Sequence, residues 1–338
     1  MEENLTKYPH RRYNILTGEW VLVSPHRTQR PWQGKQESES KNQSINYDPD
    51  CYLCPNNTRA NGEKNPKYES TYVFDNDFAA LLPYTKPFDY NEGLLKAESE
   101  KGICKVVCFS PNHSLTLPNM ELNDIEKVIT VWQREYKELG QLEDINHVQI
   151  FENKGAIMGC SNPHPHGQIW AQKSIPTEVA KKTANQKEYF QQYGKSLLSS
   201  YLEQEVDLNE RILSQNNNFM SLVPFWAVWP YEVIIIPKRH MSHIGQMTGQ
   251  EKSDFAGQLK TVTKIYDKLF DTSFPYSAGI HQSPTDQVHD EWHWHMPFYP
   301  PLLRSATVKK FMVGYEMFGM PQRDITPEYA AMVLKNLK

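Results

Sequence analysis

Three polar side chains stand two residues apart in one short segment: His164, His166 and Gln168. Residues two apart point to the same face of an extended chain, so this spacing predicts a single polar row. A proline before each histidine holds the backbone extended, and Gly167 leaves room for a group to approach the backbone closely. A neutral imidazole is a nucleophile near pH 7 without help from a second base. The row therefore predicts attack by a histidine on phosphorus; a solvated histidine-rich loop is the plain alternative.

The glutamine in this row limits the reaction. Its amide can donate hydrogen bonds to phosphate oxygens as negative charge builds on them. Unlike a histidine, however, Gln168 cannot deliver a proton to a leaving group. We therefore expect a leaving group that departs readily as an anion, such as a phosphate ester.

A second motif with its own chemistry is the pair Cys51-x-x-Cys54. By itself such a pair is equally a redox couple or two unrelated thiols. The chain has no second Cys-x-x-Cys, which excludes a four-thiolate zinc ribbon. A tetrahedral zinc ion would need two more ligands, and neutral imidazoles are the natural partners of two thiolates. If one histidine of the polar row binds the metal, its neighbour stays free to attack.

These residues need strands and helices to hold them in place. Two β-rich runs around a Thr-Gly-Glu turn predict a hairpin over residues 13–25. Apolar residues at helical spacing predict a helix over 123–139 with Asn123 as its N-cap, and a longer helical stretch over 178–206. Further strands are expected at residues 104–110, 147–152 and 166–172.

The second half of the chain repeats this order. Its strands and helix are expected at residues 231–237, 250–270, 276–281 and 292–299. The His-x-His pattern also recurs, as His293-x-His295. A matched order of elements with a doubled His-x-His indicates two copies of one α+β unit. We expect an N-terminal half over 1–177 that carries the nucleophile and a C-terminal half over 178–338.

Composition limits the class of protein. The chain has 338 residues, of which 39% are hydrophobic, enough for a large core and against wholesale disorder. No apolar run is long enough to span a membrane, and the N-terminus shows no apolar signal segment. Five cysteines, an odd number, suit a reducing cytoplasm, and a net charge of -4 argues against a general nucleic-acid binder. We expect a cytoplasmic enzyme that engages neither membrane nor nucleic acid.

Six short motifs are spread over nearly the whole chain. They are Ser24-Pro-His-Arg-Thr-Gln-Arg-Pro-Trp32, Phe74-Asp-Asn-Asp-Phe-Ala-Ala-Leu81, Phe151-Glu-Asn-Lys-Gly155, Asn162-Pro-His-Pro-His-Gly-Gln168, Pro300-Pro-Leu-Leu-Arg-Ser-Ala-Thr307 and Lys310-Phe-Met-Val-Gly-Tyr-Glu-Met317. Together with the duplication, they resemble the galactose-1-phosphate uridylyltransferase family of the histidine-triad superfamily. The resemblance implies a duplicated histidine-triad (HIT-like) α+β fold, with a mostly antiparallel sheet and flanking helices.

The resemblance implies a two-step (ping-pong) transfer of UMP. In the family the free histidine, here His166, attacks the α-phosphorus of UDP-glucose, releases glucose 1-phosphate and becomes uridylylated. Galactose 1-phosphate then takes the uridylyl group and leaves as UDP-galactose, a step of the Leloir pathway of galactose metabolism. Glutamine at the third triad position, here Gln168, sets the transferases apart from the hydrolases. Two rival interpretations are a nucleotide-sugar phosphorylase, which uses inorganic phosphate as acceptor, and a zinc-stabilised binding module without catalysis.

The resemblance also implies metal ligands. A structural zinc ion is expected at Cys51, Cys54, His113 and His164. A second ion, zinc or iron, is expected at His281, His293 and His295. Related enzymes add a glutamate from the helix after the first repeat, but that position is Lys182 here, and Glu178 lies one turn earlier. The second site is therefore open between a three-histidine site, a site assisted by Glu178, an empty site and a hydrogen-bonded polar cluster.

Substrate contacts follow from the same resemblance. Catalysis is assigned to His166, Gln168 and Ser161. Contacts with the nucleotide are assigned to Arg27, Arg30, Asn76, Asp77, Phe78, Phe151, Asn153, Gly159, Cys160, Ser161 and Gln168. Contacts with the hexose are assigned to Lys310, Phe311, Val313, Tyr315, Glu316 and Gln322, in a segment that alternatively reads as a final strand. In the family the hexose-binding residues come from the partner subunit, which implies a homodimer with shared active sites. No organic cofactor is implied.

Overall fold

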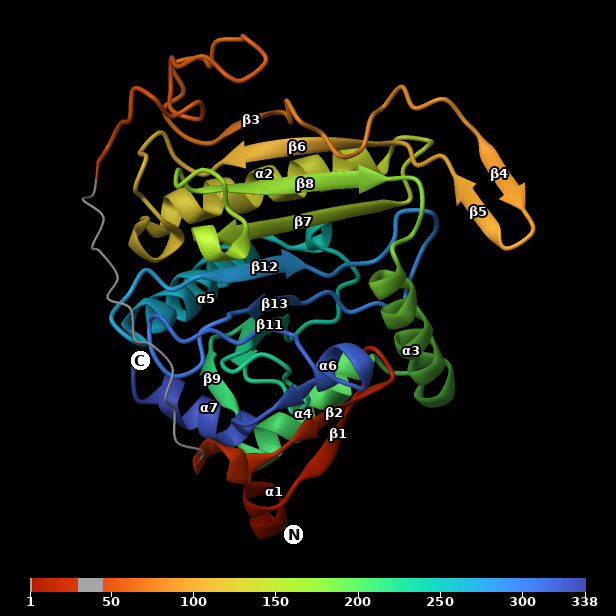
Figure 1. The fold of residues 1–338 in the computed structure, drawn as a ribbon, viewed down its shortest axis with the longest axis vertical. Coiled ribbons are helices and arrows are strands. Elements are labelled where there is room, and N and C mark those ends of the chain that lie inside the picture. The colour runs from red at the N-terminus through yellow and green to blue at the C-terminus, as the bar shows by residue number, and fades with distance from the viewer. Residues whose placement is uncertain (1, 30–44) are drawn as a thin grey trace.

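A nine-stranded sheet runs through the molecule and carries the predicted nucleophile (Figure 1). The computed structural model describes residues 2–29 and 45–338. The strand order is β3-β6-β8-β7-β12-β13-β11-β10-β9, and every neighbouring pair is antiparallel. In chain order the strands are β3 (Tyr72–Asp75), β6 (Gly102–Cys108), β7 (His147–Lys154), β8 (His166–Gln172), β9 (Ile212–Gln215), β10 (Phe219–Leu222), β11 (Val233–Pro237), β12 (Tyr276–Ile280) and β13 (Met296–Tyr299). The α+β class with a mostly antiparallel sheet is confirmed.

Two helices, α2 (Leu122–Gly140) and α5 (Gly249–Lys268), pack side by side on one face of this sheet (Figure 1). The apolar residues that predicted α2, among them Ile129 and Trp132, are buried in the main core. Burying each such side chain stabilises the fold by roughly 1.5–3 kcal/mol. The predicted N-cap Asn123 is wrong, because Glu121 has the extended backbone of a cap residue and Asn123 already lies inside the first turn.

The remaining helices lie around the second half of the sheet. They are α1 (Glu2–Lys7), α3 (Thr177–Tyr193), α4 (Leu197–Leu208), α6 (Tyr315–Phe318) and α7 (Pro327–Lys335). The predicted helical stretch over 178–206 is therefore two helices. It breaks because Gly194 takes a left-handed conformation at φ 65°, and the Ser196 side chain then caps α4 by accepting from the backbone of Ser199.

The two halves meet where β7 pairs with β12, with Phe151 opposite Gly279. On either side of this pair the strands follow in matching order, so that β8 corresponds to β13 and β6 to β11. The duplicated architecture expected from the doubled His-x-His is thus present in the sheet. The division at residues 177 and 178 stays a prediction. The strand predicted over 292–299 is shorter, because it begins only at Met296 and leaves His293 in the preceding loop.

Two smaller sheets complete the fold of the described residues. Strands β1 (His10–Asn14), β2 (Glu19–Val23) and β14 (Gln322–Arg323) join the two ends of the chain, and β1 with β2 forms the predicted hairpin. Strands β4 (Asp89–Glu92) and β5 (Leu95–Glu98) form a hairpin that projects from the body (Figure 1). Within the described ranges, no helix combines the length and the apolar character needed to cross a membrane.

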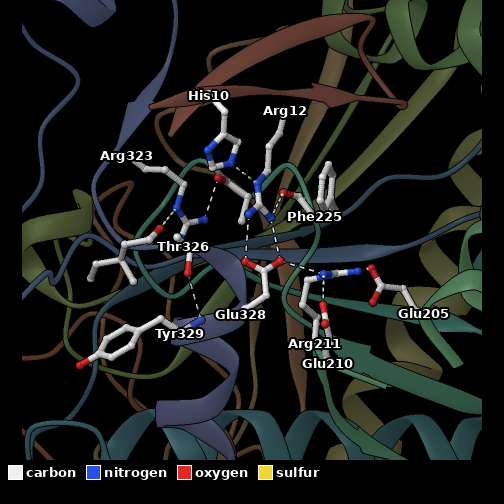
Figure 2. Close-up of polar contacts among 12 residues, drawn as sticks. His10, Arg12, Glu205, Glu210, Arg211, Phe225, Arg323, Thr326, Glu328 and Tyr329 are labelled. Atoms are coloured by element: carbon white, nitrogen blue, oxygen red, sulfur yellow. Dashed lines mark hydrogen bonds and ion pairs between the residues drawn. The ribbon is translucent and has the colours of Figure 1, made fainter. Parts of the chain in front are cut away.

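A buried ion-pair network fixes the small sheet at the chain ends (Figure 2). Arg12 of β1 donates to both carboxylate oxygens of Glu328 on α7, at 2.7 and 2.9 Å. Arg211 donates to the same carboxylate at 2.7 Å and to Glu205 at 3.0 Å. The Arg12 guanidinium also lies 4.3 Å from the centre of the Phe225 ring. The network therefore joins β1, α4, α7 and Arg211, the residue directly before β9, into one unit.

The network predicts a loss of stability at acid pH. Burial alone would raise the pKa of Glu328, but the hydrogen bonds and charges of Arg12 and Arg211 lower it to about 2. Because the folded-state pKa lies below the unfolded value near 4.5, the stabilisation is complete above about pH 5 and is lost as the pH falls towards 2. We expect about 3 kcal/mol of the free energy of unfolding to disappear over this range. Denaturant unfolding at a series of pH values checks this, and Glu328→Gln should flatten the profile while destabilising the protein at pH 7.

Candidate active site and metal centre

The predicted nucleophile, His166, is the first residue of β8 and is partly exposed. Its Nδ1 lies 2.7 Å from the carbonyl oxygen of His164, and because a carbonyl can only accept, Nδ1 carries the proton. The lone pair is therefore on Nε2, which no group in the described part of the chain hydrogen-bonds. Burial lowers the pKa of His166 below its usual value, so the ring is neutral near pH 7. The arrangement presents one unprotonated nitrogen at the surface of the sheet.

Gln168 follows two residues later on the same face of β8. Its Oε1 accepts a hydrogen bond of 3.0 Å from the indole Nε1 of Trp170. Because the oxygen is engaged, the amide NH₂ group is left to donate towards whatever His166 attacks. Sequence reasoning missed Trp170, although its spacing of two residues from Gln168 on the same strand was a usable signal.

His164 lies just before β8, and its ring is fully buried whereas His166 is partly exposed. Cys108, the cross-strand partner of His166, belongs to one buried cluster with Cys51 and Cys54, so the face of β8 that carries His166 adjoins the residues around His164. At Gly167 two groups of the protein itself approach the backbone closely, as the sequence predicted. A Cβ there would lie 3.0 Å from the Phe151 carbonyl oxygen and 3.1 Å from the Phe109 ring, so the glycine is required by packing inside the protein.

His164 instead belongs to a buried cluster with Cys51, Cys54 and His113, whose candidate ligand atoms all lie within 4.8 Å of one another. The Cys54 sulfur is 3.5 Å from Nδ1 of both His113 and His164, and the Cys51 sulfur is 4.0 Å from Nδ1 of His164. These four residues are the predicted first metal site, and the structure brings all of them together.

The cluster fits a metal ion chemically. His164 Nε2 donates to the carbonyl oxygen of Ser110 at 2.8 Å, which leaves the Nδ1 lone pair facing the thiols. Burial lowers the pKa of His164 to about 4 and raises that of Cys54 to about 11, so without a cation the groups are neutral imidazole and thiol. A divalent ion would deprotonate the thiols, and two thiolates with two imidazoles are a usual set for tetrahedral zinc.

The predicted nucleotide contacts divide into two groups. Asn76, Asp77 and Phe78 follow β3 at the edge of the sheet, and the Phe78 side chain is 82% exposed. Asp77 forms a buried ion pair of 3.1 Å with Arg59, a residue that sequence reasoning missed. The Asp77 carboxylate is thus already positioned by a cation, with one oxygen left for a hydroxyl group.

The second group surrounds the turn after β7. Asn153 accepts a 2.6 Å hydrogen bond from Ser277, and Gly159 is left-handed at φ 79°. Ser161 is exposed, whereas the Cys160 thiol donates to the carbonyl of Asn162 at 3.0 Å and is therefore occupied. The Phe151 ring contacts the edge of Trp170, with ring centres 5.7 Å apart. These residues lie on and beside the strand that pairs with β8.

The predicted hexose-binding residues line a separate cavity of about 1080 Å³. Its lining includes Arg27 and also Lys310, Phe311, Val313, Tyr315, Glu316 and Gln322. The segment is not a final strand, because residues 311–314 are irregular and α6 follows. No residue of β8 lines this cavity, and Figure 1 shows α6 beside β2, well away from β8. Arg30 lies outside the described residues.

The predicted second metal site does not assemble as a ligand set. Glu178 is exposed and forms an ion pair with Lys181. Both nitrogens of His293 are within hydrogen-bonding distance of protein oxygens, and Nε2 of His281 is 2.8 Å from Nζ of Lys182. Burial lowers the pKa of Lys182 to about 8, so the side chain is still largely an ammonium group at pH 7. Of the four alternatives for the second site, the hydrogen-bonded polar cluster of His281, His293 and His295 agrees with these contacts.

The fold and the site define a duplicated α+β protein in which β8 carries a histidine and, two residues later, a glutamine. Residues 1–176 match the family model described as galactose-1-phosphate uridyl transferase, N-terminal domain, and residues 182–338 match the model of its C-terminal domain. The chain therefore belongs to the galactose-1-phosphate uridylyltransferase family.

Individual relatives agree with this assignment. The chain is 51% identical to the galactose-1-phosphate uridylyltransferase of Haemophilus influenzae over 98% of this chain and 95% of that protein. It is 48% identical to the one from Saccharomyces cerevisiae, over 99% and 96%. Among solved structures, a uridylyltransferase superimposes with a TM-score of 0.77 at 26% identity, covering 97% of both chains. An ADP-glucose phosphorylase from Arabidopsis thaliana with bound ADP-glucose gives a TM-score of 0.76 at 25% identity, over 98% and 99%.

Proposed function

We propose that this chain transfers UMP from UDP-glucose to galactose 1-phosphate in two steps through His166. The observation that carries the proposal is the free Nε2 of a neutral imidazole whose other nitrogen is tied to the carbonyl of His164. The names of the relatives supply galactose 1-phosphate and the uridylyl group, and the family resemblance supplies UDP-glucose as the donor.

In the first step the Nε2 lone pair attacks the α-phosphorus of UDP-glucose. The N–P bond forms as the bond from phosphorus to the bridging oxygen breaks, and the electron pair leaves on glucose 1-phosphate. The imidazole of His166 gains positive charge, which the carbonyl of His164 stabilises through the Nδ1 proton. The free amide hydrogens of Gln168 donate to the phosphate oxygens. Because a sugar phosphate leaves as an anion, no proton has to be delivered to it.

In the second step a phosphate oxygen of galactose 1-phosphate attacks the same phosphorus and displaces His166. The N–P bond breaks, its electron pair returns to Nε2, and UDP-galactose leaves. We place the nucleotide against the residues after β3 and around the turn after β7, including Phe78, Asn153 and Ser161. Asn153 lies on β7, which pairs with β8, and Ser161 lies in the segment that leads into β8. Phe78 follows β3, which is separated from β8 only by β6, and these positions support the placement.

We propose that the four-residue cluster holds a zinc ion with a structural role. When bound, the ion would fix the segment that carries His164 and hence the carbonyl that orients His166. No step of the transfer requires it as a Lewis acid. The five free cysteines support a reducing, cytoplasmic location.

The test is intact-protein mass spectrometry after mixing with UDP-glucose alone. We expect one uridylyl adduct per chain and none in a variant without His166. Turnover should be faster with galactose 1-phosphate than with inorganic phosphate as acceptor. The opposite order would favour the phosphorylase that the Arabidopsis structure represents.

The hexose-binding segment predicts a shared active site in a homodimer. It lines a cavity to which β8 contributes nothing, and exposed apolar side chains such as Phe311 and Phe318 are left around it. We propose that a second copy of the chain brings this segment to His166. Mixing inactive His166→Gly and Glu316→Ala chains should then restore part of the activity, because each mixed dimer has one intact site. Lack of any recovery in demonstrably mixed dimers would contradict the shared site.

The amide at position 168 predicts how the enzyme avoids hydrolysis. Gln168→His should supply a general acid next to the phosphate and raise hydrolysis of UDP-glucose relative to transfer by about 10²-fold. Gln168→Asn, which keeps the amide, is the matched control and should not increase hydrolysis. Product analysis by chromatography separates the two reactions. If hydrolysis stays at the wild-type ratio in Gln168→His, the explanation of the glutamine is wrong.

A further inference from the structure

The C-terminal half fixes its His-x-His pair by the same hydrogen bonds as the N-terminal half. His293 Nε2 donates to the carbonyl of Pro237 at 2.8 Å, and His295 Nδ1 donates to the carbonyl of His293 at 3.1 Å. These bonds repeat those that fix His164 and His166. The ring that corresponds to the nucleophile, His295, is only 1% exposed, so it offers no reactive nitrogen to a substrate.

The groups that face the first histidine of each pair differ in kind. Two thiols lie next to Nδ1 of His164. In the other half, the hydroxyl groups of Ser196 and Ser199 lie 2.8 and 3.4 Å from Nδ1 of His293. Because Nε2 of His293 carries its proton, Nδ1 must accept from a hydroxyl. The lone pair that could bind a metal is therefore taken by a serine, and neutral hydroxyls are poor metal ligands compared with thiolates.

A lysine from α3 lies next to the remaining histidines. Nζ of Lys182 is 2.8 Å from Nε2 of His281, and the Lys182 side chain is buried. The rings of His281 and His295 stack with their centres 5.3 Å apart, and their backbones are joined by a β-bridge. Nε2 of His295 is buried without a hydrogen-bond partner. An ammonium group has three protons and no lone pair, so it donates hydrogen bonds to imidazole nitrogens. An imidazole lone pair that accepts such a bond is not available to a metal ion.

We propose that Lys182 takes the place of a metal ion in this second cluster, so that each chain binds a single ion, at Cys51, Cys54, His113 and His164. The Lys182 ammonium group joins α3 to His281, which follows β12 and is joined to His295 by a backbone β-bridge. Among His281, His293 and His295, only Nε2 of His295 keeps a lone pair that no hydrogen-bond donor uses. A single ligand atom does not hold a metal ion against the repulsion of the nearby lysine charge. In the C-terminal half, hydrogen bonds thus hold the histidine cluster in the way that metal coordination would hold the corresponding residues of the N-terminal half.

The first experiment counts metal ions in the wild-type protein. After zinc loading and removal of weakly bound metal, elemental analysis should give one ion per chain. A Cys51→Ser/Cys54→Ser chain should give none. Two ions in the wild type, one of which remains in the double variant and disappears on adding His281→Asn, would overturn the proposal.

The second experiment changes the lysine itself. Lys182→Glu should bind a second ion, because a carboxylate would replace the ammonium group beside two imidazole lone pairs. Lys182→Gln, which removes the charge without adding an anionic ligand, is the matched control and should stay at one ion. With cobalt, the added ion in Lys182→Glu should show no thiolate-to-metal absorption, since no cysteine belongs to this cluster. A Lys182→Glu chain that unfolds cooperatively and still binds one ion would overturn the role given to the ammonium group.

Discussion

Replacing His166 by glycine should reduce uridylyl transfer by about 10⁶-fold, the scale on which removal of a catalytic nucleophile acts. The substitution removes the only group that forms the covalent bond to phosphorus, and the phosphate-binding amide of Gln168 cannot compensate. Steady-state assays of UDP-galactose formation measure the loss. In parallel, the uridylyl adduct should disappear from the mass spectrum.

The loss must be separated from unfolding. The His166→Gly chain should keep the wild-type metal content and melting temperature, because the ring is partly exposed and makes one hydrogen bond through its side chain. Added imidazole should enter the space left by the ring and restore part of the reaction, since it supplies the missing nitrogen. A variant that is folded and still forms the adduct would show that another residue is the nucleophile.

The second large effect is expected from Cys51→Ser. A structural zinc site contributes on the order of 10 kcal/mol to the folded state, so loss of a thiolate should remove most of the metal and several kcal/mol of stability. Elemental analysis and thermal unfolding with and without added zinc measure both. Once refolded with excess zinc, the variant should retain substantial transfer activity, because no step of the reaction passes through the ion.

Cys104→Ser is the matched control for this experiment. It makes the same chemical change at another buried thiol, on β6, outside the cluster. It should lower the free energy of unfolding by about 1–3 kcal/mol, because a hydroxyl group is then buried, and it should leave the metal content unchanged. A structural role for the ion would be contradicted if metal-free and metal-loaded wild-type protein had the same melting temperature and the Cys51→Ser chain melted at that temperature as well.

Much of the scaffold could be read from local pattern. The helix α2, the strands β6, β7 and β8 and the hairpin of β1 and β2 lie within a few residues of their predicted positions. Helical and strand periodicity depend on neighbours along the chain, so they are visible in the sequence. The starts of elements were less reliable, as Glu121 and Gly194 show, because caps and breaks depend on the backbone conformation of single residues.

The partners that the sequence did not reveal are contacts between distant residues. The Phe109 ring packs against Gly167, Asp77 forms an ion pair with Arg59, and Lys182 lies within hydrogen-bonding distance of His281. None of these partners lies near its residue in the chain. Periodicity and motif spacing carry no information about them, which is why the second histidine cluster stayed open between a metal site and a hydrogen-bonded polar cluster.

The sequence by itself determined which reactive atoms the chain owns: two His-x-His pairs, one Cys-x-x-Cys and a glutamine in place of a third histidine. The tertiary structure alone decided which of these atoms are available. An imidazole has two nitrogens, and a carbonyl or hydroxyl far away in the chain selects the one that keeps its lone pair. Burial then exposes His166 and hides His295, so two segments of the same pattern become one nucleophile and one structural cluster.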